Sequence, residues 1–203
     1  MKRISILVVL SLFFAARANA EIQKSGPEVW PGKLMVGVRP LGMQLSFSDY
    51  GAPVPGIIYG IGDRVIYKLG LDIAGIVASF SKVTLWLGGE VNVGGRGNFA
   101  FIEPGVFVQV SLEKLVQKFP LVPLIRAGVS GPISVPYGYT GATLYGAFQL
   151  KVGGGAYYFL TKNIGVGADI NFGFGPGFAK YTGTLHTGFA GFWDFTAGAR
   201  FAF

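Results

Sequence analysis

Hydrophobic and polar residues alternate along much of the chain from Lys33 onward, most regularly over residues 189–203. One face of this last segment would carry Phe189, Gly191, Trp193, Phe195, Ala197, Ala199, Phe201 and Phe203, and the other Phe192, Asp194, Thr196, Gly198, Arg200 and Ala202. A period of two places such sets on opposite faces of a β-strand. An apolar outer face with a polar inner face is typical of a strand in a membrane-spanning barrel.

The same alternation recurs in earlier segments. It predicts strands within 33–47, 64–78, 83–93, 99–112, 123–130, 143–160 and 163–174. Their predicted inward side chains include Lys68, Asp72, Trp86, Glu90, Asn92, Arg126, Tyr145, Gln149, Lys151, Asp169 and Asn171. The pattern predicts an all-β fold: a transmembrane antiparallel up-and-down β-barrel of about eight strands, an even number as such barrels require. Ten strands are the alternative, because 55–62 and 131–140 could each supply one.

Several positions interrupt the pattern. In the first segment Pro40 switches the outward set from even to odd positions, which suits a bulge, and a second bulge is predicted at Glu103-Pro104-Gly105. Short turns at 80–82 and 161–163 fall on the side of both termini, and longer loops at 48–63, 131–142 and 174–187 on the other side. The exceptions are a short outer loop at 94–98 and a long inner connection at 113–122. The segment 111–119 could form a short interfacial helix there.

The composition indicates that much of the protein surface is not exposed to water. The chain has 203 residues, is 51% hydrophobic and only 13% charged, whereas soluble domains average about 25% charged residues. Its mean hydropathy is +0.50. A spanning helix needs about 18 apolar residues in a row, and the sequence has no such run. The other structure that satisfies every backbone group in lipid is a closed β-barrel.

The N-terminus predicts export. Lys2 and Arg3 precede an apolar run at 4–15, and Ala18-Asn19-Ala20 is an A-x-A cleavage site, which together indicate a signal peptide. We assign 1–20 to the signal peptide, 21–32 to a periplasmic lead-in and 33–203 to the barrel. The chain has no cysteine, which excludes a lipoprotein, disulfides and thiolate metal sites. After cleavage 14 basic residues face 10 acidic ones, a net charge of +4, without the basic runs typical of nucleic-acid binding.

The C-terminal stretch TAGARFAF resembles the β-signal that ends bacterial outer-membrane proteins and is read by the barrel-assembly machinery. Thr196, Gly198, Phe201 and Phe203 occupy its places. The whole mature chain resembles a small outer-membrane barrel of the OmpA and opacity-protein type, which implies location in the outer membrane with both termini periplasmic. Trp193 and Phe203 would lie about 25 Å apart along the membrane normal, in opposite aromatic girdles.

The predicted interior pairs four bases with four acids: Lys68, Arg126, Lys151 and Arg200 with Asp72, Glu90, Asp169 and Asp194. Buried charges need partners, and an eight-stranded barrel is just wide enough for side chains to fill. We therefore expect ion pairs that plug the lumen, with Arg126 and Arg200 as partners of Asp169 and Asp194. The alternative is a narrow channel for small solutes, because inward glycines at 165, 167 and 173 leave space.

Catalytic chemistry has little support in the sequence. Barrels that resemble lipid A deacylases use a His-x-Ser pair, but the histidine of this chain, His186, is followed at that spacing by Gly188. We predict no cofactor and no enzymatic activity, with lipid A modification as a second alternative. The expected partners are outer-membrane lipids, the assembly machinery and an unidentified surface ligand. Arg64, Arg96 and Lys180 could meet lipopolysaccharide phosphates. The predicted function is structural or interacting, through the outer loops.

Overall fold

A computed structural model of the chain describes residues 33–46, 65–80, 83–96, 99–112, 120–136, 142–181 and 183–203. The predicted signal peptide, its cleavage after Ala20 and the lead-in 21–32 lie outside these residues and stay predictions. The outer loop predicted at 48–63 and most of the helix predicted at 111–119 lie outside them as well.

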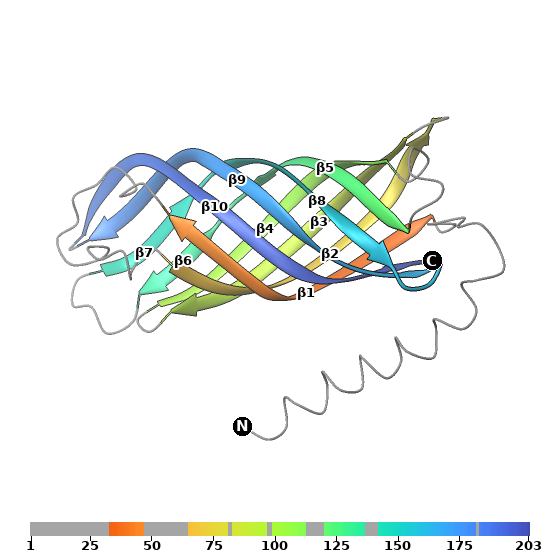
Figure 1. The fold of residues 1–203 in the computed structure, drawn as a ribbon. Coiled ribbons are helices and arrows are strands. Elements are labelled where there is room, and N and C mark those ends of the chain that lie inside the picture. Colours follow the sequence, from red (N-terminus) through yellow and green to blue (C-terminus); the bar gives the residue numbers. More distant parts are fainter. Residues whose placement is uncertain are drawn as a thin grey trace, which may run out of the picture.

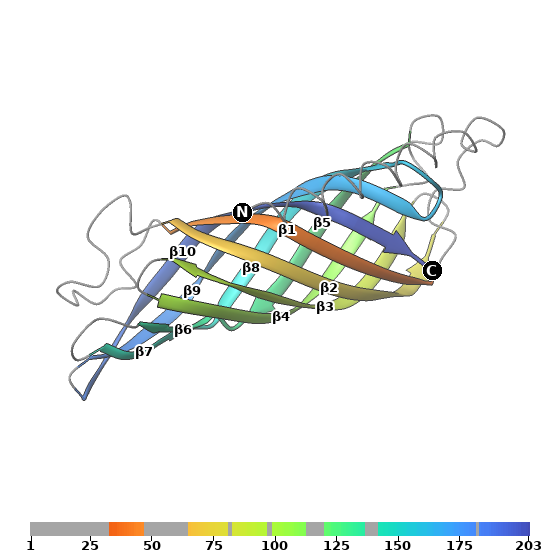
Figure 2. The same ribbon diagram turned by 90° about the horizontal axis from the view of Figure 1, so that it is seen from below.

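Within the described ranges, ten antiparallel strands form one sheet that closes on itself. They are β1 (Leu34–Ser46), β2 (Val65–Ser79), β3 (Thr84–Arg96), β4 (Phe99–Ser111), β5 (Leu121–Ser130), β6 (Ile133–Pro136), β7 (Ala142–Ala147), β8 (Gln149–Phe159), β9 (Ile164–Tyr181) and β10 (Thr184–Ala202). Closure comes from β10, which pairs with β9 on one side and β1 on the other. Figures 1 and 2 show tilted strands wrapped into a tube, with the C-terminus at one end and β6 and β7 at the other. The predicted fold class is confirmed.

Two pairs of strands are each a single span across the barrel. β5 continues into β6 after a break at Gly131 and Pro132, and β7 continues into β8 after a break at Phe148. The pairing register runs through both breaks, since Ser130 faces Gln149 and Ile133 faces Gly146. Because two of the ten strands continue the strand before them, the described part of the chain forms eight spans. Residues 133–136 thus lengthen an existing span, while 55–62 lie outside the described residues.

Two of the predicted outer loops are wrong in extent. Residues 174–187 continue β9 and β10, which stay paired up to Tyr181 and Thr184 around a turn with Gly183 at a φ of 84°. Residues 131–142 include the strand β6. These segments are rich in glycine, proline and threonine, which predicts loops. Main-chain pairing between neighbouring strands satisfies their N–H and C=O groups whatever the side chains are, and so extends the sheet.

The bulge predicted at Pro40 is confirmed. The register of β1 shifts against both β10 and β2 between residues 38 and 42. Val38 and Leu41 are both exposed, while Arg39 and Gln44 are both buried, so the extra residue reverses the alternation as predicted. The bulge predicted at Glu103-Pro104-Gly105 is wrong, because β4 pairs with β3 without a shift through all three residues. An outward proline fits there without disturbing the register.

Burial follows the predicted alternation along the spans. Leu71 is 59% exposed and the next residue, Asp72, only 4%; Ile125 is 61% exposed and Arg126 4%. The outer wall is therefore a continuous apolar surface, and the polar side chains of the strands point into the barrel. No helix among the described residues is long and apolar enough to cross a membrane.

Candidate functional site: a charged lumen

Ten charged side chains are buried inside the barrel in the described part of the chain. They are Arg39, Lys68, Arg126, Lys151 and Arg200, with Asp72, Glu90, Glu103, Asp169 and Asp194. Five of each sign cancel, and the five acids are half of the 10 in the whole sequence. A charge taken out of water is costly unless it is paired and hydrogen-bonded. The arrangement of these partners therefore decides what the lumen can do.

Two lysines hold one group of carboxylates together. Lys68 Nζ lies 2.7 Å from Asp194 Oδ2 and 3.1 Å from Glu103 Oε2. Lys151 Nζ lies 2.7 Å from Glu90 Oε1, 3.0 Å from Glu103 Oε1 and 3.6 Å from Asp194 Oδ2. Each ammonium thus has at least two anionic neighbours on different strands. This group ties β2, β3, β4, β8 and β10 to one another across the interior.

Three arginines form a second group that shares Glu90 with the first. Arg39 lies 3.2 Å from Asp72 and 2.8 Å from Glu90. Arg126 lies 3.2 Å from Glu90 and 3.6 Å from Asp72, and Arg200 lies 3.3 Å from Asp169. Because Glu90 accepts from Lys151 as well as from Arg39 and Arg126, its carboxylate links both groups.

Neutral side chains complete the connections. Gln109 Oε1 accepts from Arg200 at 2.9 Å and from Arg126 at 3.3 Å, which joins the Arg200–Asp169 pair to the rest. Asn92 donates to Glu103 Oε2 at 3.1 Å, and Ser130 donates to Glu103 Oε1 at 2.8 Å. All ten charges therefore belong to one continuous network, which we call the lumen network.

Glycines make room for the lumen network. Lys68 lies opposite Gly42 and Gly94, and Lys151 lies opposite Gly128 and Gly173 on the neighbouring strands. The other charged residues that face glycine are Asp72 (Gly37), Arg39 (Gly70), Glu90 (Gly105), Arg126 (Gly153), Asp169 (Gly155) and Arg200 (Gly37 and Gly165). Because glycine has no side chain, it leaves space on the lumen side of its strand. The long charged side chain opposite can use this space to extend across the lumen.

An apolar cluster packs inside the barrel at the end that carries the C-terminus. It consists of Met35, Ala74, Trp86, Phe107, Val122, Leu124, Tyr157, Phe159 and Ala202, none more than 3% exposed. We call it the apolar seal. It packs directly against the lumen network, with the Arg200 guanidinium 4.0 Å from the Tyr157 ring centroid and that of Arg126 3.8 Å from Phe107. The Trp86 indole N–H donates to Ser111 Oγ at 2.8 Å, so its polar atom is satisfied.

The structure places all eight sequence-predicted charges inside the barrel, but it pairs some of them differently. Asp169 contacts Arg200 as expected, whereas Asp194 contacts Lys68 and Lys151 instead of an arginine. The sequence reasoning missed Arg39 and Glu103. Both occupy inward positions of the alternation, Arg39 just before the Pro40 bulge and Glu103 in the segment wrongly assigned to a bulge.

The space expected beneath three inward glycines is occupied. A side chain on Gly173 would meet the Phe192 ring, and one on Gly165 would lie 3.0 Å from the Phe159 ring. Gly167 lies against the backbone of Ala156 and Tyr157. The inward glycines therefore accommodate neighbouring aromatic residues and strands and are not evidence for a pore.

The predicted assembly-signal residues lie along the seam of the barrel. Phe203 and Leu34 exchange two main-chain hydrogen bonds, of 2.8 and 3.1 Å, at the point where β10 meets β1. Thr196 points inward and is 3% exposed, while Phe203 and Trp193 are 67% and 44% exposed on the outer wall. Gly198 approaches the backbone of Val38 and Arg39. Phe201 shares the outward set of its strand.

The remaining predicted positions add no second site in the described residues. His186 lies in β10 with its backbone opposite Ala179. Lys180 is exposed near the end of β9, Arg96 ends β3, and Arg64 lies outside the described residues. Within the described ranges no three His, Cys, Asp or Glu side chains are grouped so that they could hold a metal ion.

Comparison with known proteins supports the fold. No protein-family model matches the sequence, and no curated protein matches it significantly. The outer membrane protein OprG from Pseudomonas aeruginosa is similar in structure, with a TM-score of 0.54 and 12% identity over 86% of this chain and 97% of that one. Neisserial surface protein A gives 0.51 and 13% over 84% and 97%. The N-terminal β-barrel domain of Pseudomonas aeruginosa OprF gives 0.50 and 14% over 85% and 99%. The chain has the fold of small outer-membrane β-barrels.

Proposed function

We propose that the chain is a bacterial outer-membrane barrel with a closed lumen, which catalyses no reaction and acts through its outer loops at the cell surface. The observation that carries this proposal is the lumen network, in which ten buried charges of zero net sum contact one another across the interior. A barrel filled in this way is a rigid scaffold for the loops at its rim.

The energetics of the lumen network favour a closed state. A continuous water path would have to separate several ion pairs at once, and a buried charge that loses its partner costs about 3–5 kcal/mol. The apolar seal forms a second barrier in series, since its side chains are at most 3% exposed and the polar atoms of Trp86 and Tyr157 already donate to Ser111 and Asp169. Conduction would therefore require both layers to open together.

The proposed location is supported by three separate features. The apolar outer wall suits hydrocarbon, the fold is that of outer-membrane barrels, and the sequence predicts a signal peptide. With both termini in the periplasm, the apolar seal lies at the periplasmic end and the β9–β10 hairpin at the outer end. The expected partners are the barrel-assembly machinery, membrane lipids with lipopolysaccharide, and a surface ligand.

Planar-bilayer conductance of the refolded chain tests the closed lumen. We expect the wild type to conduct at or near zero. Arg200→Ala/Asp169→Ala removes one neutral pair from the lumen network, and Trp86→Ala/Phe159→Ala removes two of the four aromatic side chains of the apolar seal. Each double variant should stay closed, because the other barrier remains, whereas the quadruple variant should conduct.

Heat-modifiable migration verifies that every variant is folded, and Leu87→Ala serves as a control because Leu87 is 55% exposed on the outer wall beside Trp86. Large, steady conductance of the wild type would replace the proposal with the channel function. A quadruple variant that is folded but does not conduct would show that the two layers are not the barriers.

The mass of lipid A tests the absence of catalysis. Cells that express the chain should keep the lipid A mass of cells that do not, and His186→Ala should change nothing. A mass shift that disappears in His186→Ala would establish a lipid A-modifying enzyme instead.

A further inference from the structure

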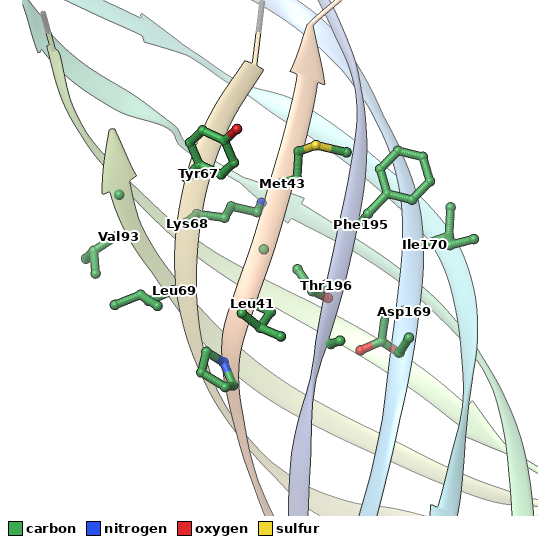
Figure 3. Close-up of a pocket in the computed structure, with 15 residues that line it drawn as sticks. Leu41, Met43, Tyr67, Lys68, Leu69, Val93, Asp169, Ile170, Phe195 and Thr196 are labelled. Carbon is green, nitrogen blue, oxygen red and sulfur yellow. The ribbon is translucent and has the colours of Figure 1, made fainter. Parts of the chain in front are cut away.

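The outer wall of the barrel carries an apolar hollow at the Pro40 bulge. It has a volume of about 680 Å³ and spans β9, β10, β1, β2 and β3, a size within the range of about 300–1,000 Å³ typical of ligand sites. Figure 3 shows it above the middle of β1, with Tyr67 and Met43 toward one end and Leu41 toward the other. We call it the wall groove.

Small residues form the floor of the wall groove. Ala168 and Ala197 face each other directly across β9 and β10, and Gly42 presents only its backbone to the outside. Larger side chains surround this floor, among them Leu41 at 70% exposure, Tyr67 at 65% and Leu69 at 55%. The groove exists because the bulge turns the Leu41 side chain outward. The short side chains of Ala168 and Ala197 beside it leave a depression in the surface.

The wall groove has one polar end. Tyr67 faces Met43 across β1 and β2, and Met43 faces Phe195, two residues from Trp193 of the predicted outer girdle. Tyrosine is favoured at the membrane interface, where its ring lies in hydrocarbon and its hydroxyl in the headgroup region. From that end toward Leu41 the outward side chains of the lining are apolar, whereas Lys68, Asp169 and Thr196 lie behind them, at most 3% exposed. An occupant should therefore have a polar end near Tyr67 and an apolar body.

We propose that the wall groove binds one acyl chain of a membrane lipid, with the polar head of that lipid toward Tyr67. This inference rests on the proposed membrane location. Within hydrocarbon the hydrophobic effect does not drive apolar surfaces together, and association comes from packing. A hollow therefore binds best the molecule that fills it most completely. A flexible, slender chain can follow the groove and regain the van der Waals contacts that a void would lose.

A second copy of the protein fits the wall groove poorly. The outer wall of a barrel is convex, so two copies would meet along a line and leave the hollow unfilled. A peptide cannot extend the sheet either, because each strand in the described residues is paired on both sides. An acyl chain is the occupant whose shape, flexibility and polarity match the lining.

Native mass spectrometry of the full chain tests this site. The protein is folded into palmitoyl-oleoyl phosphatidylcholine vesicles, extracted in mild detergent, and weighed. We expect the wild type to retain one phospholipid. Ala197→Phe should lower the bound fraction about tenfold, equivalent to about 1.4 kcal/mol, because its ring fills the floor and displaces on the order of ten carbon contacts. Ala168→Phe should have the same effect from the opposite strand.

Ala199→Phe is the matched control. Ala199 lies two residues from Ala197 on the same face and outside the lining of the wall groove, so the variant should bind as the wild type does. Equal lipid retention by Ala197→Phe and the wild type, in barrels that are heat-modifiable, would overturn this inference alone. A lipid-free dimer would assign the groove to a second copy and overturn it too. Failure of the wild type to insert into vesicles would overturn the proposed function, and this inference with it.

Discussion

Gly37 and Asp72 face each other across β1 and β2, and a Cβ atom on Gly37 would lie 2.5 Å from Asp72 Oδ1. The carboxylate that contacts Arg39 and Arg126 thus occupies the space that a side chain would need. The same opposition of glycine to charge occurs at Lys68, Lys151 and Asp169. The narrow barrel can hold so many long side chains because the residues opposite them are glycines, which have no side chain.

Gly37→Ala should therefore destabilise the barrel. The added methyl group forces Asp72 away from its arginines, and overpacking of this kind costs about 1–3 kcal/mol. Urea unfolding in lipid vesicles would measure the change. Gly75→Ala is the control, since its Cβ would have no neighbour closer than 3.9 Å, and it should be neutral. Similar losses for both variants would show that the effect is not the contact with Asp72.

Asp194→Asn should destabilise the barrel by about 3–5 kcal/mol, because Lys68 and Lys151 each lose an anionic partner while they stay buried. The double variant Lys68→Met/Asp194→Asn removes one charge of each sign and leaves Lys151 paired with Glu103 and Glu90. It should cost less than Asp194→Asn. The measurement compares the free energy of unfolding of the double variant with those of Asp194→Asn and Lys68→Met. A double variant as unstable as the sum of its parts would mean that the pair is not coupled.

Ile170→Arg should cost about 2–4 kcal/mol if the outer wall faces hydrocarbon near the bilayer midplane. Ile170 is 50% exposed. Leu185 is 62% exposed on the outer wall close to the β9–β10 turn, so Leu185→Arg should cost only about 0–1 kcal/mol. Refolding titrations in lipid vesicles would give both values. Equal penalties would mean that the lipid-facing band is placed incorrectly along β9 and β10.

Asn171 shows that a polar, inward-facing position in this lumen does not necessarily tolerate a charged substitution. It points inward, yet it is only 2% exposed, and a side chain on its neighbour Gly153 would meet its Oδ1 atom. An arginine there would enter a neutral, filled network. Asn171→Arg is therefore no harmless counterpart of Ile170→Arg.

Phe203→Asp should separate assembly from stability. The Phe203 side chain is 67% exposed, and its backbone closes the seam with Leu34; the substitution keeps those main-chain hydrogen bonds. Refolding into vesicles should therefore proceed, while the amount of heat-modifiable protein in the outer membrane of cells should fall. Normal amounts in cells would contradict the predicted assembly signal, and signal-peptide cleavage, measured by mass, should be unchanged in either case.

The sequence by itself determined which way most side chains of the spans point. Alternation is a property of a single strand, so it can be read locally, and it correctly placed Asp72, Lys151 and Asp169 inward. It also located the reversal at Pro40, because an extra residue changes the phase of the apolar set on either side. The same pattern predicts about eight spans and leaves ten open, and the described residues form eight.

The tertiary structure decided which charges contact one another. Lys68 and Asp194 are 126 residues apart in the chain, and their meeting depends on how the strands tilt and close into a tube. No local pattern carries that information, and so an arginine was expected beside Asp194. The apolar seal arises in the same way, because Met35, Trp86 and Phe159 lie on separate strands and come together only when the barrel closes.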